Sequence, residues 1–247
     1  MATSGLILAI ETSTPTARVA VLDRDGHRRA AREATAERHS SNLLRLCDEA
    51  LRAASVVPAA LDAIACGAGP GNFTGLRVGL AVAKGLALPT ERPFVLISSL
   101  AALALDILST PGATRSIAVP CIDAGKGQIY AGFFRADEAQ LVLALDEEWV
   151  LNPGELLTGS PLATAAANAA DKALLVAGNG AVRYADSIDA ALAAGRPGAR
   201  RVDVAGPSAD ALGRLALLRL ARGESDSLES SVPAYGRPPD ITRPRRG

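Results

Sequence analysis

The sequence predicts an α/β protein made of two related halves. Three observations support this prediction: three strand-like segments open the chain, a strand–helix order follows them, and a similar order begins again near residue 117. The repeat lies in the order of the elements, because the two halves share no convincing residue-by-residue similarity. We therefore expect subdomains at residues 1–108 and 109–223, followed by a polar, Pro- and Gly-rich tail at 224–247 that lies on the body.

The individual elements follow from local signals. Compact apolar runs predict strands, apolar residues at helical spacing predict helices, and Asp23-Arg-Asp-Gly26 and Asp123-Ala-Gly125 predict turns. In the first half we expect strands at about 6–10, 17–22, 27–35, 62–66 and 94–97, and helices from 39, over 73–88 and from 98 or 99. In the second half we expect strands at about 117–122, 128–134, 140–145 and 173–177, and helices near 153–158, 181–194 and 207–222.

The charge balance argues against an autonomous nucleic-acid-binding protein. Lys and Arg number 26, and Asp and Glu also number 26. A protein that binds nucleic acid by itself usually has a basic excess, because phosphate contacts supply much of its affinity. Four arginines nevertheless gather at the C-terminus, where they form either a solvated end or a contact with RNA: Arg237, Arg243, Arg245 and Arg246.

The cysteines and the apolar segments indicate a cytoplasmic protein. Cys47, Cys66 and Cys121 are odd in number, widely spaced and set among apolar neighbours, which is typical of small buried side chains in a reducing compartment. The N-terminus has no basic segment followed by an apolar signal core, and no apolar run is long enough to span a bilayer.

The most informative segment is a glycine-rich loop followed by a helix. A strand, Gly67-Ala-Gly-Pro-Gly71 and a helix come in the order that presents free backbone N–H groups to an anion, although no Gly-Lys-Ser/Thr closes a phosphate loop. Small residues then recur every four positions and line one face of the helix: Gly71, Gly75, Gly79, Ala83 and Ala87. Such a bare face permits close backbone approach, either by an element of this chain or by a partner.

The sequence offers few groups for catalysis. His27 and His39 are the two histidines, they lie far apart, and no metal-binding spacing or nucleophile elbow is present, so we predict neither a metal site nor a catalytic residue. Weak candidates for binding a cofactor sit at strand ends and glycine turns, where carboxylates facing a cleft could hold a nucleotide-bound cation: Glu11, Asp123, Gly125 and Gly178. Acidic residues are also common at such junctions because Asp suits turns.

Together, several segments resemble the TsaB (YeaZ) family. They cover nearly the whole chain in the right order: Leu8-Ala-Ile-Glu-Thr-Ser13, Gly69-Pro-Gly-Asn-Phe-Thr-Gly-Leu-Arg-Val-Gly79, Ile97-Ser-Ser-Leu100, Ile122-Asp-Ala-Gly-Lys-Gly-Gln-Ile-Tyr130 and Val232-Pro-Ala-Tyr235. The resemblance implies an actin/Hsp70-like fold of two related subdomains. It also implies a role in making N6-threonylcarbamoyladenosine at position 37 of tRNAs that read ANN codons.

The resemblance further implies a non-catalytic subunit. In that family the transfer belongs to the paralogous subunit TsaD, whose metal site uses a His-x-x-x-His pair, and the matching segment Ser98–Ile107 contains no histidine. The chain would form a heterodimer with TsaD, work with the ATPase TsaE, meet tRNA through the complex and form a homodimer when alone. Glu11 and Thr12 stand where many actin-like kinases carry Asp and then Gly, so we expect no cofactor in the isolated chain. A shared site for ATP or ADP at the partner interface stays open as an alternative.

By position, the helices that begin at His39 and Phe73 resemble those of the TsaB–TsaD helical bundle. The resemblance therefore implies an interface made of His39, Leu43, Phe73, Gly75, Leu76, Gly79, Leu80 and Ala83. The alternative function is a metalloprotease or a small-molecule kinase of the same fold, which would bind metal or turn over ATP without a partner.

Overall fold

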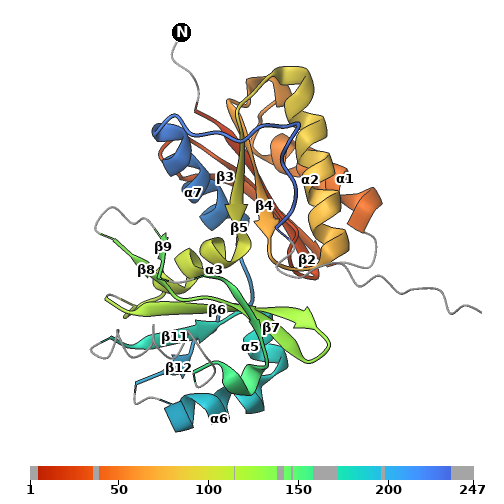
Figure 1. The fold of residues 1–247 in the computed structure, drawn as a ribbon. Coiled ribbons are helices and arrows are strands. Elements are labelled where there is room, and N and C mark those ends of the chain that lie inside the picture. The colour runs from red at the N-terminus through yellow and green to blue at the C-terminus, as the bar shows by residue number, and fades with distance from the viewer. Residues whose placement is uncertain are drawn as a thin grey trace, which may run out of the picture.

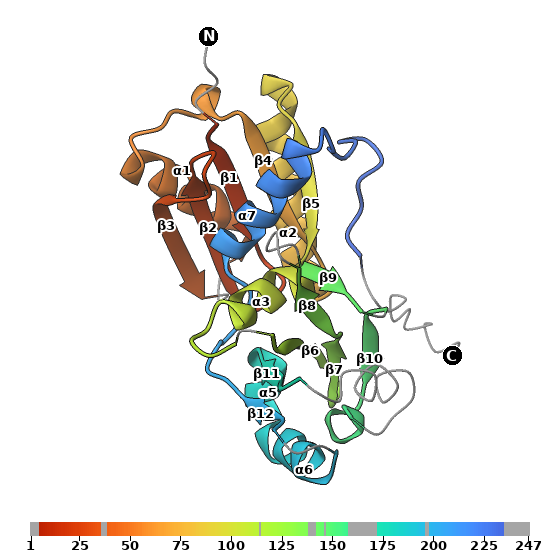
Figure 2. The same cartoon turned by 90° about the vertical axis from the view of Figure 1, so that its left-hand side faces the viewer.

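The computed structural model describes residues 5–35, 39–113, 115–137, 142–145, 147–157, 172–195 and 198–234. Figures 1 and 2 show two lobes that meet at helix α3 (Ser99–Leu108). Among the described residues, no helix combines the length and the apolar character needed to cross a membrane.

The first lobe is a mixed sheet in the order β3-β2-β1-β4-β5. Strands β1 and β2 are antiparallel, with Ile10 opposite Val19, whereas β4 and β5 run parallel to β1. All five residues of β1 are buried, as expected for a central strand covered on both faces. The strands are β1 (Ile7–Glu11), β2 (Thr16–Leu22), β3 (Arg28–Thr35), β4 (Ala63–Gly69) and β5 (Phe94–Ser98).

Helices cover both faces of this sheet because successive strand residues point to opposite sides. Leu8 and Ile10 face α1 (His39–Ala53) and α2 (Phe73–Ala87), while Ile7 and Ala9 face α3 and α7 (Ala209–Ala221). Two short 3-10 turns, η2 (Pro58–Ala60) and η3 (Leu88–Thr90), follow α1 and α2. The pairs of helices lie on either side of the sheet in Figure 1.

The second lobe repeats the pairing pattern of the first. The central strand β6 (Ile117–Gly125) is antiparallel to β7 (Gln128–Ala131) and parallel to β11 (Leu174–Ala177), as β1 is to β2 and β4. The outer positions of β3 and β5 are taken by β10 (Trp149–Leu151) and β12 (Arg200–Arg201). This correspondence confirms the predicted duplicated α/β architecture. The remaining elements are β8 (Phe134–Ala136), β9 (Val142–Ala144), η4 (Pro153–Glu155), α5 (Asn179–Arg183) and α6 (Ala185–Gly195).

Four predictions for the second half were inaccurate. The strand expected at 128–134 is interrupted after β7, because β8 turns away to pair with β6 at Ala118 and with β9. β6 continues through the turn expected at 123–125, and the reversal falls at Lys126–Gly127. The helix expected at 181–194 is interrupted at Tyr184, whose backbone is not helical. Near 153–158 the described residues form η4, and residues 158–171 lie outside the described part.

Helix α7 corrects the predicted subdomain boundary at residue 223. Although it follows the second lobe in sequence, α7 packs on the first sheet, with Leu212 and Ala216 in the same cluster as Ile7 and Ala9. Gly213 allows the close approach, because a Cβ there would lie 2.7 Å from the Leu22 side chain. The first lobe is therefore built from two separate stretches of the chain.

The segment after α7 lies along the first lobe and covers the edge of its sheet. The Asp226 amide donates to Phe94 O (2.7 Å), and its carboxylate accepts from the Leu96 amide (2.7 Å). Arg219 bonds both Leu96 O and Asp226, each at 2.9 Å. Further along, the Ala234 amide donates to Ala68 O (2.8 Å), so residues 226–234 pack back on the body. The arginines at 237–246 lie outside the described residues.

Replacing Asp226 by Ala should destabilise the protein, because the Leu96 amide and Arg219 lose their shared acceptor. We expect the free energy of unfolding, measured in urea, to fall by about 1–3 kcal/mol. Asp48→Ala is the matched control, since Asp48 forms an exposed pair with Arg52 on α1, and it should cost under about 0.5 kcal/mol. Equal losses in both variants would show that Asp226 does not hold the sheet edge.

Candidate functional site

The turn that connects β1 to β2 is a cluster of buried polar residues. Glu11, Thr12, Ser13 and Thr14 are all almost fully inaccessible to solvent. The backbone N–H of Asn72, at the end of the glycine loop, donates to the backbone oxygen of Ser13 at 2.7 Å. Asn72 also caps α2, because its side chain accepts from the Gly75 amide at 2.8 Å. The turn, the loop and the start of α2 therefore form one connected unit.

The small-residue face of α2 and the glycine loop cover this turn. A Cβ atom at Gly71, Gly75 or Gly79 would lie less than 3.0 Å from Ser13 or Thr12, and one at Gly67 would lie 2.5 Å from the Glu11 carboxylate. Real Cβ atoms essentially never approach so closely. The close approach expected from the glycine spacing is therefore made by another part of the same chain.

This packing corrects part of the expected partner interface. The residues on the inner side of α1 and α2 are core residues that another polypeptide could not touch without displacing the β1–β2 turn or the sheet: Leu43, Gly75, Leu76, Gly79, Leu80 and Ala83. Phe73 is different, since it is 39% exposed. The side chain of His39 lies outside the described part of the structure.

The solvent-facing side of α1 and α2 carries large apolar and small residues together with an arginine. On α2 the exposed positions are Thr74 and a series that recurs every four residues, at Phe73, Arg77, Ala81 and Gly85. The Arg77 guanidinium lies 3.7 Å from the centre of the Phe73 ring, and a Cβ at Gly85 would meet nothing within 4 Å. On α1, Leu44 is 56% exposed. We call Leu44 and the four residues of that series the outer α1–α2 surface. The sequence analysis singled out Phe73 but missed the other four, although Arg77, Ala81 and Gly85 follow Phe73 at a spacing of four residues.

Glu11 is held in its buried position by two hydrogen bonds. Its carboxylate accepts from the Ser13 amide (2.6 Å) and from the Ser99 hydroxyl (2.9 Å) at the first residue of α3. Burial raises the pKa of Glu11 above its usual value, and the hydrogen bonds from Ser13 and Ser99 only partly oppose that rise. The carboxyl group thus joins β1 to α3 at the junction between the lobes.

Asp123 occupies the corresponding strand end in the second lobe but has different surroundings. It accepts from the Gly125 amide (2.9 Å), the Tyr184 hydroxyl (3.0 Å) and Arg183 (3.2 Å). Glu11 and Asp123 therefore each have protein donors of their own, and these hydrogen bonds account for both carboxylates without a cation.

The candidate glycines of the second lobe serve turns. Gly178 has a φ of 113°, and a side chain there would overlap Cys121 O. Gly125 has a φ of 70° and open space around its Cα. Both conformations favour glycine, which explains these residues without a ligand.

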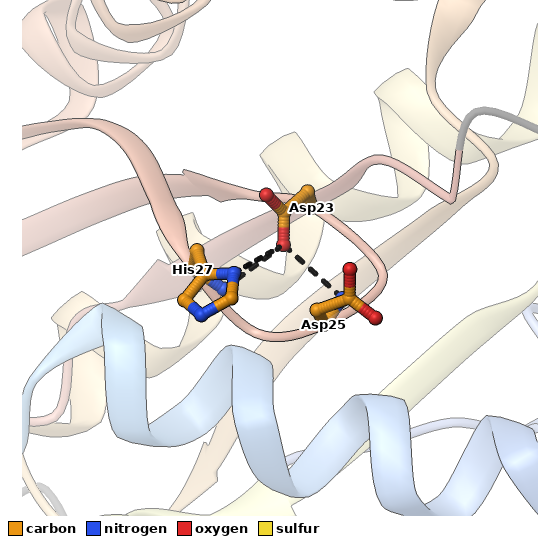
Figure 3. A group of neighbouring side chains, drawn as sticks. All are labelled: Asp23, Asp25 and His27. Carbon is orange, nitrogen blue, oxygen red and sulfur yellow. Dashed lines mark hydrogen bonds and ion pairs between the residues drawn. The ribbon is translucent and has the colours of Figure 1, made fainter.

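A separate group of possible metal ligands lies at the tip of the β2–β3 hairpin. Asp23, Asp25 and His27 each offer a ligand atom within 4.8 Å of the others (Figure 3). The Asp23 carboxylate accepts from the backbone amides of Asp25 (3.1 Å) and His27 (3.0 Å). These bonds are those of an Asp-stabilised turn, which accounts for the cluster without a metal.

Hydroxyl groups are paired with carboxylates at three places among the described residues: Ser98 donates to the exposed Glu148, Ser208 donates to Asp106 (2.8 Å), and Ser99 donates to Glu11. Ser99 bonds Glu11, but both side chains are fully buried. The three cysteines are buried and unpaired, and burial raises the pKa of the Cys47 thiol to about 12 and those of Cys66 and Cys121 further. A thiol is nucleophilic only as the thiolate, so these groups are inert near neutral pH.

Comparison with known proteins identifies related sequences and a related fold. Residues 32–181 match the family model of TsaD, tRNA N6-adenosine threonylcarbamoyltransferase. The Escherichia coli tRNA threonylcarbamoyladenosine biosynthesis protein TsaB is 35% identical over 147 residues, which are 60% of this chain and 62% of that protein. A Kosmotoga olearia tRNA N6-adenosine threonylcarbamoyltransferase is 33% identical over 140 residues, covering 50% of this chain and 42% of that protein.

The structural match covers more of the molecule. The crystal structure of a Pseudomonas aeruginosa protein with similarity to the peptidase YeaZ superposes with a TM-score of 0.78 and 31% identity, covering 94% of this chain and all of that one. The sequence matches, in contrast, span less than two thirds of the length of these curated relatives. The expected α/β fold of two related lobes, each with a mixed sheet flanked by helices, is confirmed.

Gly79→Ala should destabilise the protein, because the new methyl group would overlap the Thr12 side chain. We expect a loss of about 1–3 kcal/mol in the free energy of unfolding. Gly85→Ala, six residues further along the same helix, is the matched control. Its methyl group meets open space, so it should stabilise by up to about 1 kcal/mol through helix propensity. If both substitutions stabilise, the glycine face of α2 is not closed by the β1–β2 turn.

Glu11→Gln should flatten the dependence of stability on pH. A carboxyl group whose pKa is raised by folding stabilises the native state when protonated, and that contribution is lost as pH rises above 4.5, its ordinary pKa. Denaturant unfolding between about pH 5 and pH 8 should therefore show a steeper loss for the wild type than for the variant. Because other groups titrate equally in both proteins, parallel curves would exclude a raised pKa at Glu11.

Proposed function

The chain belongs to the TsaB (YeaZ) family, and from that premise we propose that it supports the formation of N6-threonylcarbamoyladenosine in tRNA as a subunit of a protein complex. The supporting comparison is the name of the E. coli relative, a tRNA threonylcarbamoyladenosine biosynthesis protein. We extend the proposal to position 37 of tRNAs that read ANN codons, as the family resemblance implies. In this scheme tRNA meets the chain through the complex.

We infer that the catalytic partner is a TsaD-type protein, bound at the outer α1–α2 surface. The inner sides of both helices are already packed into the core. On their outer sides, that surface presents two large apolar side chains, Leu44 and Phe73, to solvent. The exposed small residues Ala81 and Gly85 would let a partner helix approach the α2 backbone closely. The same surface would pair two copies of this chain when no partner is present.

Three features of the first lobe and the cysteines support a non-catalytic role. Helix α3 contains no histidine, the buried thiols are protonated near neutral pH, and Glu11 is enclosed. The β1–β2 turn, where an actin-like kinase would receive phosphates, is filled by the glycine loop and α2. We therefore propose that ATP or ADP binds at the partner contact rather than in the isolated chain, and that a TsaE-type ATPase acts on the complex.

A charge placed on the outer α1–α2 surface should prevent assembly. We expect Leu44→Asp and Phe73→Asp each to weaken the complex with a TsaD-type partner by about 100-fold, because a carboxylate would be buried against apolar atoms. Val182→Asp is the matched control, since Val182 is 62% exposed on α5 in the other lobe. The measurement is binding by co-purification and titration, with modified nucleoside in tRNA quantified after reconstitution.

Three results would contradict the proposal. The first is normal assembly and normal modification with both α1–α2 variants. The second is modification of tRNA by the isolated chain. The third is metal-dependent proteolysis or steady ATP turnover by the isolated chain, which would favour a metalloprotease or a small-molecule kinase instead.

A further inference from the structure

A pocket of about 470 Å³ lies on the side of the first lobe opposite the outer α1–α2 surface. It opens between the tip of the β2–β3 hairpin, the end of α3 and one side of α7. Figure 3 shows that hairpin tip beside the pale blue α7. The volume falls within the range of pockets that hold small molecules.

The floor of the pocket is apolar. Leu105 from α3 and Leu217, Leu218 and Ala221 from α7 line it. Leu105 is buried, whereas Leu217 and Leu218 stay partly exposed although they pack against the core of this lobe. The pocket therefore exposes apolar side chains of α7 to solvent at the margin of the contact between α7 and the sheet.

The rim of the pocket carries an excess of positive charge. Arg24 and Arg214 both line it, and Asp25 is the carboxylate beside them. Within the described residues neither arginine forms an ion pair, whereas the nearby Arg28 and Arg219 are each bonded to carboxylates. Arg214 is held over the pocket by one hydrogen bond, from Nε to Gly26 O (3.3 Å).

The hairpin is built to bring these groups together. Gly26 has a φ of 79°, which the turn needs, and a Cβ there would lie 3.3 Å from Arg214 Cγ. A second anchor joins the hairpin strand to α7, because Arg28 bonds both oxygens of Asp210 at 2.6 and 2.7 Å. The separation between the arginine rim and the leucine floor is thus fixed by the fold.

We propose that this pocket binds a small amphipathic anion, with an apolar chain or ring on the leucine floor and a carboxylate, sulfonate or phosphate group between Arg24 and Arg214. A guanidinium group pairs well with such oxyanions and can bond two oxygens at once. A neutral hydrophobe would leave both charges unpaired, and a cation would be repelled by them. The site is independent of partner binding, since the sheet separates it from α1 and α2.

Decanoate is a suitable probe, measured by titration calorimetry and by NMR shifts of leucine methyl groups in the full chain. Saturable binding is expected, with shifts confined to the pocket leucines. Arg24→Met and Arg214→Met should each weaken binding by about tenfold, because each removes one charge-assisted contact while keeping the apolar stem. Arg222→Met is the matched control, as Arg222 is exposed at the end of α7 outside the pocket, and it should bind decanoate like the wild type.

Two further probes test the charge directly. Decan-1-ol and decyltrimethylammonium have the same chain length, and both should bind at least about tenfold more weakly than decanoate. Unfolding curves of each variant confirm that the fold is intact before binding is compared. The proposal is overturned if decanoate fails to saturate the wild type, if the cation binds as well as the anion, or if neither pocket arginine variant changes the affinity.

Discussion

The fit between the β1–β2 turn and the start of α2 is the constraint on which the rest of the first lobe depends. Four glycines meet the turn where no side chain could be accommodated, and the Asn72 amide closes the contact on Ser13 O at 2.7 Å. Because Glu11 at the same turn also bonds Ser99, the contact sets the position of α3 relative to β1. The sheet, the helix pair and the junction between the lobes are thus fixed through a few buried residues.

The two lobes use the same strand pairing for different purposes. At the end of β1 the carboxyl group of Glu11 is enclosed and bonded to neutral donors. At the end of β6 the carboxyl group of Asp123 is partly exposed and bonded to Arg183 and Tyr184. Duplication of a fold therefore preserves the backbone and not the electrostatic environment.

Local patterns in the sequence predicted most elements of the fold, because apolar spacing and turn residues act over a few positions. The same patterns could not show that α7 returns to the first sheet, which depends on contacts between residues some 200 positions apart such as Leu212 and Ile7. The two-residue strand β12 has too little sequence to give a signal. The candidate site shows the same limit: the spacing of Gly75 and Gly79 correctly indicated a close approach, but periodicity cannot tell which polypeptide makes it.

The return of α7 also affects how the protein is synthesised. One face of the first sheet, including Ala9, Ala20 and Val95, is completed by side chains that follow residue 208. Domains generally fold as units and from the N-terminus during translation. Here the N-terminal lobe leaves the ribosome with that face uncovered, and the second lobe is made in full before the missing helix arrives. Nascent chains of this architecture therefore carry an open apolar surface for most of their elongation time.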